Sequence, residues 1–119
     1  MKIKKFKVDI YDWDVKLIEV QSAKDFKKLL KELRKFKCSD EDIAIAKANI
    51  MKKNGGDHFY QLSRRESLIL LYKQDSKRIR NSVLCHEKRH LEDRILQYCF
   101  VDDIEAAGYL AGYLGEKLI

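Results

Sequence analysis

The chain has 119 residues, of which 45% are hydrophobic and 37% are charged. This length and balance predict a single globular domain over residues 1–119 and exclude a disordered chain. No apolar run approaches the length of a membrane span, and the first residues lack the apolar stretch of a signal peptide, so the expected location is cytoplasmic. Three cysteines without a C-x-x-C motif argue against a disulfide framework.

The net charge of +6 permits attraction to acidic partners, including nucleic acid. Much of this charge lies in mixed stretches such as residues 24–37, which are typical of a solvated helix face. No basic patch is interleaved with aromatic residues, so nucleic-acid binding has no specific support. No pattern in the sequence fixes the oligomeric state.

Residues 5–20 are predicted to form two β-strands. Apolar and polar residues alternate up to Ile10, and a second apolar run from Val15 to Val20 follows a polar turn. Alternation with a period of two is the pattern of a strand with one buried face. Trp13, in the turn, is expected to pack in the core or hairpin rather than to line a site.

Two helices are predicted next, each opened by a serine with an aspartate three residues later. Ser22 and Ser39 have this spacing, which is typical of helix N-terminal caps. The first helix places apolar residues between Phe26 and Phe36 at helical spacing, with lysines on the other side. The second helix is expected to end at Gly55–Gly56.

Two further strands, over residues 59–62 and 67–72, are predicted to flank a charged turn. The second is almost continuously apolar and should be the more buried of the two. His58 precedes this region in no ligand-like spacing, so it is interpreted as a surface or turn histidine. Strands combined with helices predict an α+β fold.

The second half of the chain is predicted to contain a long helix and a shorter last one. The long helix is expected from about Lys77 to Tyr98, with Asp75 or Ser76 as its cap. The last helix is expected to begin near Asp102 after a short turn. It contains three glycines, each of which destabilises a helix by about 1 kcal/mol relative to alanine, so close approach to the long helix is expected.

The long helix carries an H-E-x-x-H motif at residues 86–90. Residues four apart share a helix face, so His86 and His90 can each present a ring nitrogen to one metal ion. Glu87 lies about 100° further round the helix, within reach of a metal-bound water. This residue pattern indicates a zinc site with a neighbouring general base.

A helical plot predicts which residues share the face of the motif. One sector contains the three motif residues together with Ile79, Val83 and Arg94, and an adjacent sector is apolar. Lys88, Arg89 and Glu92 are expected to point to water. The histidines are therefore expected to look inward from a partly apolar face.

Catalytic zinc normally takes three protein ligands, so a third must come from elsewhere. Glu105, on the last helix, is the favoured candidate, because the glycines would let that helix approach the motif. Asp103 is the rival ligand. Glu105 has a competing interpretation as part of a capping box with Asp102.

The residues that carry the motif also resemble a known family. H-E-x-x-H on one helix, followed by a glutamate on the next, resembles the gluzincin branch of zinc metallopeptidases. The wider stretch, over about residues 67–115, is similar to small zincin-like peptidases encoded by phages and mobile elements. This resemblance implies a minimal zincin-like domain, with a small, twisted, mostly antiparallel sheet packed on the motif helix and a C-terminal partner helix.

The resemblance also implies a division of roles. His86, His90 and Glu105 would bind Zn²⁺, and Glu87 would be the general base. Three residues are candidates to stabilise the oxyanion, because no second histidine is available for that role: Tyr109, Tyr113 and Arg94. An exposed edge strand would align a protein or peptide substrate.

The expected function is therefore that of a zinc-dependent metallopeptidase, a hydrolase that uses Glu87 to activate water. In an alternative, the protein binds zinc but catalyses no reaction. It would then be a catalytically silent, zincin-like module that acts as a regulatory or binding protein in a phage or mobile element. A basic nucleic-acid-binding domain without metal is a third reading. The sequence does not name a substrate.

Overall fold

Four β-strands, four α-helices and three short 3₁₀ helices make up the structure, a computed structural model that describes residues 1–119. The strands are β1 (Lys2–Val8), β2 (Trp13–Glu19), β3 (Gly56–Gln61) and β4 (Glu66–Leu71). The helices are α1 (Phe26–Lys35), α2 (Asp40–Ile50), α3 (Lys77–Tyr98) and α4 (Ile104–Leu118). The 3₁₀ helices are η1 (Asp9–Tyr11), η2 (Ala23–Asp25) and η3 (Leu62–Arg64). None of the helices is both long and apolar enough to cross a membrane.

The strands form one mixed sheet in the order β1-β2-β4-β3. The hairpin pairs β1/β2 and β3/β4 are antiparallel, whereas β2 and β4 run parallel in the centre. The parallel pair arises because α1, α2 and β3 separate β2 from β4 in sequence. Strand β3 pairs with β4 alone, so it forms one edge of the sheet.

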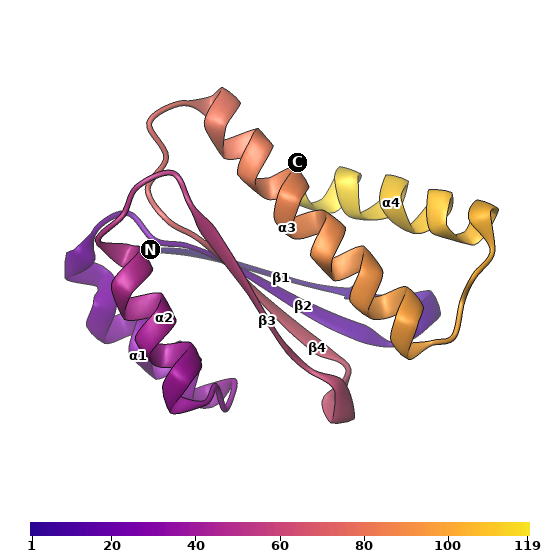
Figure 1. Cartoon of the computed structure of the whole chain (residues 1–119), viewed down its shortest axis with the longest axis horizontal. Helices are drawn as coiled ribbons and strands as arrows, with labels where there is room; N and C mark the ends of the chain where they lie inside the picture. Colours follow the sequence, from indigo (N-terminus) through magenta and orange to yellow (C-terminus); the bar gives the residue numbers. More distant parts are fainter.

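Helices cover both faces of this sheet, as Figure 1 shows, with α1 and α2 on one side and α3 and α4 on the other. Strand β4 explains this arrangement, because successive side chains of a strand point to opposite faces. Leu68 and Leu70 pack in the cluster that contains the leucines of α1. Ile69 and Leu71 pack in the cluster that contains the leucines of α3 and α4.

The predicted α+β class is confirmed, and so are most of the element positions. Helix α3 has the predicted bounds, and its N-cap is Ser76, whose hydroxyl accepts a hydrogen bond from the Ile79 amide. Ser39 caps α2 in the same way. Ser22 caps the short η2 rather than α1 itself.

Two of the three strand pairs are antiparallel, in line with the predicted mostly antiparallel sheet, although the central pair is parallel. Two expectations for the strands and their turns need correction. Ile10 lies in η1 and is 84% exposed, so it does not continue the first strand. Strand β3 begins at Gly56, three residues earlier than predicted, and therefore includes His58. Trp13 is fully buried at the start of β2, as expected.

Candidate metal centre

Helix α3 is anchored to the sheet by one apolar stripe. Leu84, Leu91 and Ile95 are fully buried against the sheet and α4. Their spacing of seven and four residues keeps them on one face of the helix. This packing turns the neighbouring face, which carries the H-E-x-x-H motif, toward the edge strand β3.

The two motif histidines lie side by side at the surface of α3. Their Nε2 atoms are 3.1 Å apart, and the ring centres are 4.6 Å apart. In a tetrahedral site, two nitrogens each about 2.0–2.1 Å from zinc lie about 3.3 Å from one another. The separation of the two imidazoles therefore fits a shared zinc ion, although both side chains are exposed rather than inward-looking.

Glu87 is the buried member of the motif, with 4% of its surface exposed. Burial raises the pKa of its carboxyl group, and the charge of Asp57 raises it further, whereas His86 acts in the opposite direction. The side chain fits because Gly56 of β3 has none. A β-carbon at position 56 would come within 3.3 Å of Glu87 Cγ and 2.9 Å of the Leu70 carbonyl oxygen.

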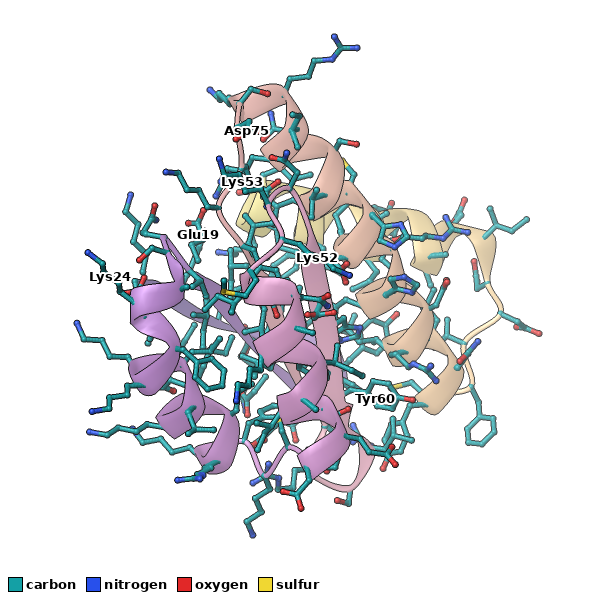
Figure 2. All side chains as sticks on the ribbon, turned by 60° about the vertical axis from the view of Figure 1, so that its left-hand side comes forward. Glu19, Lys24, Lys52, Lys53, Tyr60 and Asp75 are labelled. Atoms are coloured by element: carbon teal, nitrogen blue, oxygen red, sulfur yellow. The ribbon has the colours of Figure 1, made fainter.

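A pocket of about 370 Å³ lies between α3 and β3 and brings the motif together with the strand. Helix α3 contributes His86, Glu87, His90 and Arg94, and β3 contributes the stretch from Gly56 to Tyr60 apart from Phe59. Arg94 lies over the Tyr60 ring, 4.1 Å from its centre. Figure 2 shows Tyr60 at the side of β3 that faces α3.

His58 is a pocket residue that the sequence interpretation placed elsewhere. Its Nε2 lies 2.8 Å from the Ser67 hydroxyl, which also accepts a hydrogen bond from the Trp13 indole at 3.0 Å. Burial lowers the pKa of His58 to about 4, and the charges of His90 and Arg94 add to this. Extending the strand back to Gly56 would have put His58 and Tyr60 on one face, since residues two apart share a face.

Asp57 is the second pocket residue that sequence reasoning missed. Its carboxylate accepts hydrogen bonds from the Tyr72 hydroxyl at 2.6 Å and from the Asn49 amide at 3.1 and 3.0 Å. Both donor groups are neutral, so the charge of the Asp57 carboxylate is not balanced by an ion pair. That charge contributes to the raised pKa of Glu87.

The structure does not bring Glu105 to the two histidines. Glu105 is exposed on the first turn of α4 and is absent from the pocket, and nowhere do three or more His, Cys, Asp or Glu side chains group as they would around a metal ion. The physical reason is the leucine stripe of α4. Leu110, Leu114 and Leu118 are buried and turn the opposite side of the helix, with Glu105, to solvent.

The structure also corrects the predictions for the N-terminal cap and the glycines of α4. Asp103 is the N-cap of α4, because its carboxylate accepts hydrogen bonds from the amides of Glu105 and Ala106. This replaces the expected capping box with Asp102. The glycines do not mediate close packing, since a β-carbon at Gly108, Gly112 or Gly115 would meet nothing within 4 Å.

Of the three candidates for oxyanion stabilisation, only Arg94 lines the pocket. Tyr109 is 79% exposed on α4, and the Tyr113 hydroxyl donates to the Lys7 carbonyl oxygen at 2.9 Å. Lys88 and Glu92, expected to point to water, instead form a largely buried ion pair. Lys88 also donates to the Ala111 carbonyl oxygen, which ties α3 to α4.

This pocket therefore combines two adjacent imidazoles, a buried carboxyl with a raised pKa and a cationic side chain beside an open strand edge. Such a set can bind a divalent metal through nitrogen and move a proton at the carboxyl. When the chain is compared with protein-family models, with curated proteins and with solved structures, none of them matches.

Proposed function

We propose that the protein is a zinc-dependent peptidase of zincin-like type, with His86 and His90 as zinc ligands and Glu87 as general base. The observation that carries this proposal is the 3.1 Å separation of the two Nε2 atoms beside the buried carboxyl of Glu87. A separation close to the tetrahedral value, with an acid directly after the first histidine, matches the part of a zinc-hydrolase site that an H-E-x-x-H helix supplies.

Zinc held by His86 and His90 would lower the pKa of a bound water toward ~7 and would polarise a carbonyl group. In this mechanism Glu87 takes a proton from the attacking water and passes it to the leaving amine. Because burial raises the pKa of Glu87, its carboxylate oxygen is a stronger base than an exposed glutamate and holds the proton until the leaving amine accepts it. Asp57, with its negative charge beside Glu87, strengthens that basicity.

Strand β3 supports a peptide as the substrate. Its outer edge is not paired with another strand, and the pocket opens along the same strand. An extended peptide can add to such an edge through main-chain hydrogen bonds, which places a peptide carbonyl near the histidines without sequence-specific contacts. Arg94 lies at one end of this pocket and is the residue positioned to stabilise negative charge on the substrate.

Metal analysis of purified protein tests the zinc ligands. Protein prepared without chelator should contain about one zinc ion per chain, and His86→Ala and His90→Ala should each lose most of it. Arg89→Ala is the matched control, because Arg89 lies between the two histidines in sequence and outside the pocket. Full zinc retention by both histidine variants, with unchanged circular dichroism, would falsify the assignment.

A catalytically silent, zinc-binding regulatory module is the second candidate function. The observation in its favour is that two protein ligands, not three, come together around the site. Glu87→Gln separates the two candidates, because it keeps the shape of the side chain and removes the base. A peptidase should lose at least 100-fold in turnover and retain zinc. A wild type that binds zinc but cleaves none of a panel of unfolded proteins supports the silent module.

A further inference from the structure

A second, larger groove adjoins the candidate site. It has a volume of about 820 Å³ and lies among η1, η3 and the C-terminal end of α3. Seven of its ten lining residues are hydrophobic, and Arg94 lines both this groove and the smaller pocket that contains the motif. A chain that occupies the candidate site can therefore continue past Arg94 into the groove.

Two guanidinium groups, neither of which forms an ion pair, give the groove a positive charge. Arg65 donates to the Tyr11 carbonyl oxygen at 2.9 Å and lies over the Tyr98 ring, whereas Arg94 lies over Tyr60. The ion pairs made by arginines elsewhere in the chain involve Arg64, Arg80 and Arg89. No Asp or Glu lines the groove. The charge of Arg65 acts on Asp12, which lies outside the groove and pairs with Lys7.

Phe100 provides an independent indication that the groove binds a partner. It lies directly after the C-cap of α3 with φ at 55°, a left-handed conformation usually taken by glycine. The hydrogen bonds from Phe100 to Gln97 and from Val101 to Leu96 complete this helix end. Phe100 is nevertheless 94% exposed, so it gains almost no burial that would offset the backbone strain.

We propose that this groove binds an extended peptide segment of the substrate in which a bulky apolar side chain stands next to an acidic side chain. The apolar side chain would pack against Phe100 and Tyr98, and the carboxylate would pair with Arg65 and Arg94. Charge complementarity selects this occupant, because a purely apolar segment would leave both guanidinium groups unpaired. The reading of the segment as substrate rests on the proposed peptidase function.

Peptide binding to the full chain, freed of metal by chelation, tests the groove without any cleavage. The probes are fluorescent peptides, acetylated or dye-capped at one end and amidated at the other, with a central Glu-Phe, Gln-Phe or Glu-Ser pair in otherwise identical alanine and serine sequences. Fluorescence anisotropy should give about tenfold tighter binding for Glu-Phe than for either analogue. Raising the salt concentration should narrow the difference between Glu-Phe and Gln-Phe.

Two variants assign the binding to the groove. Arg65→Gln should weaken Glu-Phe binding about tenfold, and Arg89→Gln, an exposed change outside the groove, should not. Phe100→Gly should also weaken binding while raising the unfolding temperature, because glycine adopts the left-handed backbone without strain. A variant that is more stable and binds more weakly cannot owe its loss of binding to misfolding.

The proposal is overturned if the three peptides bind equally or not at all, or if neither Arg65→Gln nor Phe100→Gly weakens the binding of the Glu-Phe peptide. Peptide binding without cleavage by the zinc-loaded protein would contradict the peptidase function but would still support peptide binding in the groove. Cleavage with no preference for acidic residues beside apolar ones would contradict the proposed preference of the groove but would still support the peptidase function.

Discussion

Gly56 and Glu87 are packed so closely that a β-carbon at position 56 would lie 3.3 Å from Glu87 Cγ. The same carbon would come within 3.0 Å of Val83 and 2.9 Å of the Leu70 carbonyl oxygen. The backbone contact is the most restrictive, because a strand carbonyl in the sheet cannot move aside as a flexible side chain can. The contacts with Val83 and Glu87 set how near α3 lies to β3, and hence the shape of the candidate site.

Gly56→Ala is therefore expected to destabilise the protein by roughly 1–3 kcal/mol, the usual range for overpacking a closely packed site. Gly55→Ala is the matched control, since a β-carbon at Gly55 would meet nothing within 4 Å. Urea unfolding of both variants measures the difference. Equal stability of the two variants would contradict the close packing of Gly56 against β4 and α3.

Much of the fold could be predicted because local signals agreed with the tertiary structure. Helix α3 combines a serine cap, helical apolar spacing and a clear end, and both of its bounds were predicted. Strand β4 was recognised because it is buried on both faces and is therefore continuously apolar. The parallel pairing of β2 with β4 has no local signal, since it depends on how the intervening helices return the chain.

The motif itself was found in sequence, but its surroundings were not. His58 and Asp57 were missed because the glycines before them were interpreted as the end of a helix, although Gly56 begins β3. Glu105 was nominated from the assumption that small residues on α4 face α3. The larger driving force is burial of the three leucines, which sets the rotation of α4 and leaves its glycines without contacts.

The α4 glycines give a prediction that separates these two interpretations. Gly108 and Gly112 are exposed within the helix, and a β-carbon at either position would meet nothing within 4 Å. Gly108→Ala and Gly112→Ala should each stabilise the protein by about 0.5–1 kcal/mol, because alanine loses less conformational entropy in a helix. Urea midpoints at constant m-value measure the gain. Destabilisation by either change would instead indicate close packing on that side of α4.

Zinc should stabilise the folded chain by an amount that grows with the logarithm of the ratio of free zinc to its dissociation constant. At a free zinc concentration about 100-fold above the dissociation constant, the gain is about 2.7 kcal/mol, provided that the unfolded chain does not bind zinc. For a chain of this length, that gain raises the unfolding temperature by roughly 10 °C. His90→Ala should abolish most of the shift, whereas Arg89→Ala should retain it. A shift of equal size in His90→Ala would place the metal elsewhere.

His58 should make the stability of the metal-free protein depend on pH. Burial, with the nearby charges of His90 and Arg94, lowers its pKa from 6.5 to about 4. Its side chain also contacts the Ser67 hydroxyl and the Tyr60 ring, and Asp57, His86 and Glu87 line the same pocket. Between these two pKa values the unfolded chain binds more protons than the folded one, so stability rises with pH across that window.

Acidification from about pH 6.5 to pH 4 should therefore remove stability, by at most about 3 kcal/mol through this one side chain. His58→Asn keeps a polar partner for Ser67 and removes the titration, so its stability should change less over the same window. Thermal unfolding of both proteins in chelator, at half-unit steps of pH, gives the comparison. An identical slope for the two proteins would mean that His58 titrates in the folded protein as it does in the unfolded chain.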